Sequence, residues 1–314
     1  EWLFEVGGLS IPPQTPAATG GPVRVEDYSA VRLFVQSARR VRLDFALSEK
    51  DLAPISQLCR LVDGMPLALE LAAAWTRTLS CEKITREVTH DLNLLATNQR
   101  DIPERHRSIR AVFENSWKRM SAAEREVLKH LTVFRDGFQL EAAQEICGAS
   151  IPLLSALVDK SMLYGSTSGR YQMHELLRQY IAEKLSADEQ AQDRDRHGRY
   201  YAGFLSQCFK DLSAGRIQQT LDEISTEFEN VRASWNWAIE TRQVEAVLQA
   251  HDSLYRFYEL RNRFTEGEAG LRQAAELLMA QPDAAEHRIT CITIVMRRAR
   301  FFTRLARYGP AEEF

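Results

Sequence analysis

The segment "RYQMHELLRQYIAEKL", residues 170–185, changes its hydrophobic pattern halfway along. Residues 170–173 alternate polar and apolar side chains as a short strand does, whereas from Glu175 the apolar residues recur at the spacing of a helix. His174 stands at the joint. The first N–H groups of a helix have no partner inside it, so a helix N-terminus attracts anions. The segment therefore predicts a strand, a helix and, at His174, a residue that either caps the helix or meets a bound anion.

The residues before this segment predict the rest of a winged helix. A helix over 106–119 is followed by "SAAEREVLKHLTVF", whose Ser121 and Glu124 form a capping box. Further helices are expected over 138–147 and over "IPLLSALVDKSML", 151–163. "MLYGSTSGRYQM", 162–173, contains two short β-like runs around a turn of small residues. Helices followed by a two-stranded wing indicate a winged helix, a variant of the helix-turn-helix.

A sharp corner between two helices is expected within "LVDGMPLALELAAAW", 61–75. Gly64 provides a left-handed stop for the first helix, and Pro66 suits the first position of the second. Amphipathic helices are also expected at 27–40, at 49–64 after an N-cap at Ser48, and at about 81–96.

The C-terminal part of the chain is predicted to be helical throughout. "SADEQAQDRDRHGR", 186–199, indicates a solvated helix end or a linker before it. Apolar residues step by three and four over 221–238, and 244–260 and 267–280 repeat a helix-turn-helix rhythm. We therefore expect an array of tetratricopeptide-like helical hairpins, which presents a concave surface to a partner.

Bulk composition indicates an ordinary globular chain. The 314 residues suit two or three domains, and 45% hydrophobic and 26% charged residues with a net charge of -3 give no global signature of polyanion binding. No apolar run approaches the roughly 20 residues of a membrane span. Five cysteines without a C-x-x-C pair indicate reduced core thiols of a cytoplasmic protein, rather than a metal site or disulfides. The strand-like start "EWLFEVGGL" without a methionine suggests a piece of a longer polypeptide.

Motifs of self-contained catalysis are missing from the sequence. There is no G-x-x-x-x-G-K-[ST] phosphate loop, no H-E-x-x-H, no G-x-S-x-G and no metal-ligand cluster. The chain alone is therefore not expected to be an enzyme or to hydrolyse a nucleotide.

Two motifs on either side of the predicted helices, "GMPLAL" at 64–69 and "MHE" at 173–175, together carry a family resemblance. They resemble the nucleotide-binding core of the STAND signal-transduction ATPases of the NB-ARC (AP-ATPase) class. The likeness is greatest to large bacterial regulators of the LuxR and SARP kinds, and it covers about residues 1–186. "LFEVGGLS", 3–10, is similar to the last strand of the family's P-loop domain, and "EFENVRASWNWAIE", 227–240, is similar to the opening of its sensor arrays.

The resemblance implies four parts in this chain. They are the end of the nucleotide-binding domain with a loop (1–25), a helical domain with the Gly-x-Pro motif (26–100), a winged-helix domain with the Met-His-Glu motif (101–186) and a helical, tetratricopeptide-like sensor region (187–314). The implied fold class is mainly α with a short β-hairpin.

The resemblance also implies roles for two residues. Pro66 would pack against the adenine of a bound nucleotide, and His174 would reach the β-phosphate of ADP, so that the winged helix closes on the nucleotide. Glu175 stands where plant and animal members of the family usually have Asp. ADP or ATP with Mg²⁺ would be the cofactor of the complete protein, held largely by a P-loop domain outside this chain, and tight binding to this chain alone is not expected.

The implied function is an ADP/ATP-controlled switch in transcriptional regulation. A protein or small-molecule inducer would bind the helical repeats, and the open state would oligomerise. One alternative is a DNA-binding winged-helix regulator, but its recognition helix offers mainly Lys160, offset by Asp159, and its wing offers Arg170, which argues against direct nucleic-acid binding. Another alternative is a nucleotide-independent, protein-binding helical scaffold. The arginine-rich stretch 297–307 is interpreted as a solvated or inter-repeat face.

Overall fold

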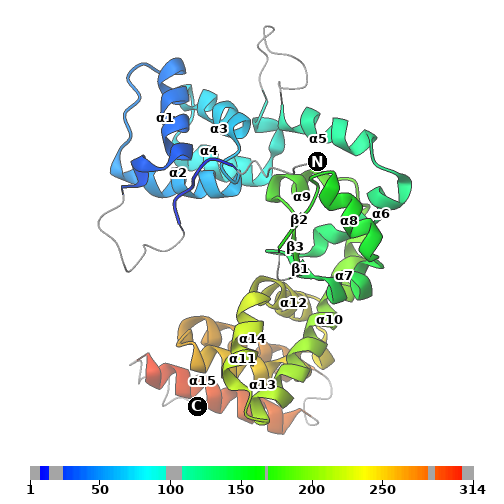
Figure 1. Ribbon diagram of the computed structural model, residues 1–314. Coiled ribbons are helices and arrows are strands. Elements are labelled where there is room, and N and C mark those ends of the chain that lie inside the picture. The colour runs from blue at the N-terminus through cyan, green and yellow to red at the C-terminus, as the bar shows by residue number, and fades with distance from the viewer. Residues whose placement is uncertain (1–7, 14–23, 97–107, 167–168, 282–286, 306–314) are drawn as a thin grey trace. The chain divides into compact units, whose positions relative to one another are not determined.

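The computed structural model describes residues 8–13, 24–96, 108–166, 169–281 and 287–305. The fold is mainly helical with one small sheet (Figure 1), which confirms the predicted fold class. The chain forms two compact units, the first made of Glu1–Thr132, Pro152–Tyr164 and Met173–Leu185, and the second of Val133–Ile151, Gly165–Gln172 and Ser186–Phe314. The division into four domains is finer than this and stays a prediction.

The first unit is built from short helices. Its α-helices are α1 (Ser29–Val41), α2 (Glu49–Leu61), α3 (Pro66–Ala73), α4 (Cys81–His90), α5 (Ile109–Lys118), α6 (Ala122–His130), α8 (Ile151–Asp159) and α9 (Glu175–Ala182), with 3-10 turns at Val25–Asp27, Ala74–Arg77, Leu92–Leu94 and Leu131–Val133. Helix α1 packs against α3, α2 packs against α4, and α9 contacts both α5 and α6.

Local capping sets where these helices begin, as the sequence predicted. Ser48 and Asp51 form a capping box at the start of α2. Ser121 and Glu124 form another at α6, where the Ser121 N–H donates to the Glu124 carboxylate over 2.6 Å. Each box satisfies helix-end N–H groups that would otherwise lack a partner. The C-terminal end of α3 is less regular than its start. The chain continues there from Ala74 as a 3-10 turn.

The second unit combines a small sheet with longer helices. Its elements are β1 (Phe138–Gln139), α7 (Leu140–Cys147), β2 (Tyr164–Gly165, at its edge), β3 (Arg170–Gln172), α10 (Ala187–Ser213), α11 (Ile217–Thr226), α12 (Phe228–Glu240), α13 (Val244–Leu260), α14 (Phe264–Met279) and α15 (Arg288–Arg304). Helix α10 packs against α7, α11, α12 and α13. Helix α14 packs against both α13 and α15.

The sheet has the strand order β1-β3-β2, with β1 antiparallel to β3. Phe138 pairs with Tyr171, and their rings stack with centroids 5.9 Å apart. The predicted helix over 138–147 is therefore wrong at its first two residues, which form a strand. The cause is non-local, because the backbone of Phe138 and Gln139 pairs with β3.

Residues 186–199 are not a linker, which corrects part of the sequence interpretation. A capping box between Ser186 and Glu189 starts α10 there, and this helix runs for 27 residues. Asp193 and His197 are buried at 1% and 3% exposure, so this end of the helix is not fully solvated. The predicted run over 221–238 is likewise two helices, α11 and α12, that meet at Glu227.

In the part of the chain that the structure describes, no helix is both long enough and apolar enough to cross a membrane. Cys59, Cys81, Cys147 and Cys208 are buried and Cys291 is half-buried, and all five thiols are free. Burial raises the pKa of Cys59 to about 12, so this thiol is neutral near pH 7 and is a packing group rather than a nucleophile.

Gly198 allows α10 to approach α12 closely. A methyl group at position 198 would lie 2.1 Å from the indole ring of Trp237. The hydroxyl of Ser234, also on α12, donates a hydrogen bond to the Gly198 carbonyl over 2.7 Å. The contact between the two helices therefore depends on the missing side chain.

Two Gly→Ala substitutions in α10 should change stability in opposite directions. Gly198→Ala should lower the free energy of unfolding by about 1–3 kcal/mol through overpacking against Trp237. Gly203→Ala should raise it by about 0.5–1 kcal/mol, because alanine favours the helix and no described heavy atom lies within 4 Å of the added methyl group. Urea unfolding followed by circular dichroism measures both, and equal effects at the two positions would contradict the packing.

Candidate functional site

The corner between α2 and α3 is locked by backbone contacts around Gly64. Its φ angle is +63°, a left-handed conformation that suits glycine. The Gly64 N–H donates to the Cys59 carbonyl at the end of α2, and the Gly64 carbonyl accepts the Leu9 N–H, each over 3.0 Å. A methyl group at position 64 would lie 2.2 Å from the Leu9 carbonyl oxygen. The predicted helix stop at Gly64 is confirmed, and no larger residue fits it.

Pro66 is the first residue of α3, as predicted. Its ring is exposed, and its missing N–H costs nothing at this position, where a helix N–H has no partner inside the helix. The adjacent residues Ala68 and Leu69 are buried in the first unit. The corner thus anchors α3 by its inner face and leaves the proline ring accessible.

His174 is the N-cap residue of α9, as the sequence placed it. Its Nδ1 accepts the Leu176 N–H over 3.1 Å. A neutral imidazole that accepts at one nitrogen carries its proton on the other. Capping the helix with Nδ1 therefore turns Nε2 into a hydrogen-bond donor.

That Nε2 atom is buried and makes no hydrogen bond of good geometry with the described residues, although the Val62 carbonyl lies near enough to the ring to favour its protonated form. Burial lowers the pKa of His174; the backbone carbonyl of Val62 and then the charges of Asp63 and Glu175 act in the opposite direction. Val62 and Asp63 immediately precede Gly64. The first unit therefore brings His174 beside the start of the Gly-x-Pro motif, although the two motifs lie far apart in the sequence.

Glu175 is already engaged within its own helix. Its carboxylate accepts hydrogen bonds from Arg178 over 2.6 and 2.7 Å and from Gln179 over 3.0 Å. Arg178 also donates to the Thr132 carbonyl over 3.4 Å. Glu175 thus orders the first turn of α9 rather than reaching toward the corner.

Sequence reasoning found Gly64, Pro66 and His174 but missed the backbone groups around them. Leu9 closes the corner and Val62 approaches the imidazole, and both do so through main-chain atoms that any residue could supply. The strand expected in the opening segment falls mostly on residues 1–7, outside the described residues, and the described residues that follow it are not in a strand.

Lys160 and Arg170, the two cations that a DNA-binding winged helix would use, are each paired with a carboxylate. Lys160 donates to both oxygens of Glu124 over 2.6 and 2.7 Å. Arg170 is 9% exposed and is paired with Glu227. Arg170 is therefore not available as a phosphate contact, and Lys160, although its side chain is 39% exposed, has its charge neutralised by Glu124.

The arginine-rich stretch of α15 is partly inter-repeat and partly solvated: Arg297 and Arg298 are largely buried against neighbouring helices, whereas Arg300 and Arg304 are exposed. Arg297 pairs with Asp252 and Arg300 pairs with Glu259, both on α13, while Arg298 pairs with Glu268 on α14 over 2.9 Å. These pairs link α15 to both preceding helices.

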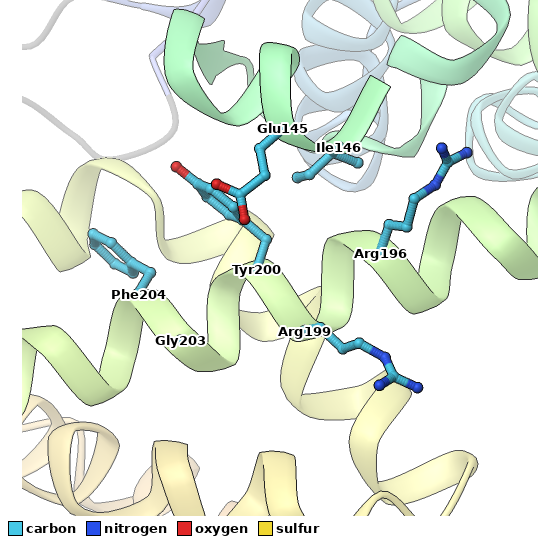
Figure 2. A pocket seen from close by; sticks show the side chains of 7 residues that line it. All are labelled: Glu145, Ile146, Arg196, Arg199, Tyr200, Gly203 and Phe204. Atoms are coloured by element: carbon cyan, nitrogen blue, oxygen red, sulfur yellow. The ribbon is translucent and has the colours of Figure 1, made fainter. Parts of the chain in front are cut away.

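A hollow of about 490 Å³ lies between α7 and α10 in the second unit. Figure 2 shows Glu145 of α7 close to the ring of Tyr200 of α10. Burial, followed by the charge of Glu145, raises the pKa of Tyr200. The two arginines at its rim, Arg196 and Arg199, pair with Asp193 and Asp195 of their own helix over 2.6 and 2.9 Å. This hollow therefore offers little to an anion.

Metal binding has no support in the residues that the structure describes. Within them, no group of three or more His, Cys, Asp or Glu side chains could hold a metal ion.

The chain matches no sequence model of a known protein family. A protein of Mycobacterium tuberculosis that is provisionally named an HTH-type transcriptional regulator is 29% identical over 280 residues, which are 86% of this chain and 31% of that protein. An uncharacterized protein of the same species is 36% identical over 174 residues, 52% of this chain and 44% of that protein. The chain thus spans less than half the length of either relative.

A STAND protein with a tetratricopeptide repeat sensor, from Pyrococcus horikoshii, aligns with 91% of this chain and 52% of that chain, at 11% identity and a TM-score of 0.28. A TM-score this low carries no fold assignment.

The state of the His174 ring can be measured directly. With ¹⁵N-labelled histidine, the His174 signal should show a neutral ring protonated at Nε2 near pH 7 and a titration midpoint below about 6.5, the ordinary histidine value. The pKa of His174 is lower in the folded protein than in the unfolded chain. Its contribution to the free energy of unfolding is therefore fully present above the unfolded pKa and is lost as the pH falls through the folded pKa. A His174→Gln variant assigns the signal, and a ring protonated at Nδ1 would contradict the cap.

Proposed function

We propose that this chain is the regulatory part of a STAND-type signalling protein that acts in transcriptional regulation under the control of bound ADP or ATP. The observation that carries the proposal is the Nε2–H of His174, a buried donor that makes no well-formed hydrogen bond, at a helix N-terminus beside the Gly-x-Pro corner. The name given to the Mycobacterium tuberculosis relative supports the regulatory part of the proposal.

The residues present fit a nucleoside diphosphate both at its phosphate and at its base. A buried N–H without an acceptor costs about 1–3 kcal/mol, and a phosphate oxygen would supply the missing acceptor. The partly positive N-terminus of α9 favours the same negative charge. The exposed ring of Pro66 offers an apolar surface for a base. When bound, the nucleotide would supply a phosphate acceptor for His174, with the charges of Asp63 and Glu175 nearby acting against the phosphate.

The chain's own residues would then act as a latch. His174 would hold the phosphate with Nε2 while Nδ1 keeps α9 capped, and Pro66 would carry the base. Loss of this hydrogen bond on exchange of ADP for ATP would release the segment that carries α9. Binding of a protein or small-molecule inducer to the helical repeats would favour the released state, which would oligomerise.

The phosphate-binding loop and the Mg²⁺ ligands of such a protein would belong to another part of the polypeptide. The coding region upstream of Glu1 should therefore encode G-x-x-x-x-G-K-[ST] within about 150–250 residues, the size of one domain. Sequencing that region decides the matter. A coding region that starts near Glu1 without such a domain would favour the nucleotide-independent scaffold instead.

His174→Ala, in the protein that includes the P-loop domain, should weaken ADP binding about ten- to a hundredfold, because it removes a hydrogen bond to a charged group. The ADP that co-purifies with the protein and the basal transcriptional output are the measurements. His90→Ala is the matched control, since His90 is an exposed residue of the same unit. Unchanged ADP retention and unchanged output in His174→Ala would remove the basis of the proposal.

A DNA-binding winged helix is the second candidate function, and the ion pairs of Lys160 and Arg170 weigh against it. We expect the 314-residue chain to show no salt-dependent binding to a random DNA duplex in fluorescence anisotropy at about 50 to 200 mM salt. Lys160→Gln should then change nothing. Binding that weakens steeply with salt and is reduced in Lys160→Gln would instead favour DNA recognition by this region.

A further inference from the structure

A buried polar network fastens the β-hairpin, which consists of β2 and β3, to the first helices of the C-terminal array formed by α10–α15. Its members come from four separate segments of the second unit, namely the turn before β1, strand β3, helix α10 and the start of α12. Their side chains are nearly inaccessible, with exposures of 9% for Arg170, 7% for Glu227, 3% for His197, 1% for Tyr201 and 0% for Asn230.

Arg170 and Glu227 are the charged pair at the centre. One guanidinium nitrogen of Arg170 donates to Glu227, and the other donates to the Asp136 carbonyl over 2.7 Å. The second oxygen of Glu227 accepts the Tyr201 hydroxyl over 2.8 Å and the Asn230 amide over 2.9 Å. Each charge is thus both paired and hydrogen-bonded, which is what a buried ion pair needs.

Asn230 completes the network, and its partners fix the orientation of its amide. Its oxygen accepts the Arg135 N–H over 2.7 Å, and its nitrogen donates to the Gly137 carbonyl over 2.8 Å. His197 lies 3.3 Å from the same oxygen through Nε2. Burial lowers the pKa of His197 to about 4, so the neutral ring can donate there. A network with all these groups satisfied is rigid.

The contacts join the small sheet, whose strands β1 and β3 are already paired through their backbones, to helices α10 and α12. The turn at 135–137 has two residues in left-handed conformations, Asp136 and Gly137, and their carbonyls point into the network. Among its described residues the hairpin enters the network through the side chain of Arg170, and β3 is also held by its backbone pairing with β1. If the hairpin moved away from α10 and α12, Glu227 would lose its counter-charge while still buried beside Tyr201, which is strongly unfavourable.

We propose that Arg170 and Glu227 are positioning residues that make strand β3 follow the helices α10 and α12, so that a rearrangement of the array is transmitted to the cap of α9. The route is covalent at its last step, because Gln172 ends β3 and only Met173 separates it from His174. The consequence for a bound nucleotide rests on the proposed function. The fastening of the hairpin to α10 and α12 is independent of the proposed function.

The test uses the 314-residue chain and three variants, Arg170→Met, Glu227→Gln and the double variant. Each single change should raise amide hydrogen exchange in residues 170–172 at least tenfold and shift the ¹⁵N signal of His174, while the core of α13 and α14 keeps its protection. The double variant removes both charges, so its effect should be smaller than the product of the two single effects. Arg170→Lys, which keeps the charge with fewer donors, should have an intermediate effect and remains usable if Arg170→Met does not fold.

The matched control is the exposed pair of Arg232 and Glu229 on the same helix α12, with side-chain exposures of 54% and 37%. Arg232→Met and Glu229→Gln should change hairpin exchange less than twofold, and additively. Unchanged exchange at 170–172 in the Arg170 and Glu227 variants would overturn the proposal. So would equally faster exchange throughout the second unit, or an unmoved His174 signal, because these would indicate a contribution to stability without positioning.

The same variants separate this inference from the proposed function. If His174→Ala releases ADP in the protein with its P-loop domain but Glu227→Gln does not, the latch stands and the transmission fails. If Glu227→Gln frees the hairpin and shifts the His174 signal while His174→Ala leaves ADP retention unchanged, the transmission stands and the nucleotide latch fails.

Discussion

The hydrogen bond from the Leu176 N–H to Nδ1 of His174 is the constraint on which the candidate site depends. Histidine is an unusual N-cap, since Ser, Thr, Asp and Asn do this work better in most helices. Those residues accept the helix N–H through an oxygen on a short side chain. An imidazole accepts with one nitrogen and, because the ring is neutral, must donate with the other. The cap therefore creates the donor that faces the Gly-x-Pro corner.

The isolation of that donor differs from the way this chain treats its other buried polar groups. Around Glu227, charges and amides are matched to partners on four segments, although the cost of burying them is high. A few other buried atoms also lack a described partner, among them Ser37 Oγ and Trp235 Nε1. His174 is distinct from these because it lies at a helix N-terminus, which favours an anion, and beside an ordered backbone corner.

Much of the fold could be predicted from the sequence where the determining contacts are local. The capping boxes at Ser48 and Ser121, the stop at Gly64 and the cap at His174 all depend on residues within one helical turn, so their patterns were sufficient. Strand β1 was mistaken for helix because its pairing with Tyr171 comes from a distant segment. Likewise, Asp193 and His197 look like solvated residues until the helices that pack on α10 are in place. For the site, the sequence supplied the side chains and the structure supplied Val62 and Leu9, whose backbone atoms leave no signature.

The ion pairs of α15 have a consequence for how the helical array can vary. Arg297, Arg298 and Arg300 each meet a carboxylate on one of two neighbouring helices. Apolar positions accept other apolar side chains of similar volume, whereas these three pairs match at a single axial offset and rotation. Inserting one residue into α15 before Arg297 would turn the three guanidinium groups by about 100° around the helix axis relative to the preceding part of the helix, and would separate all three from their partners at once. Substitutions at the apolar positions of this array should therefore be tolerated more easily than an insertion or deletion before Arg297. The three ion pairs fix how α15 is aligned with α13 and α14.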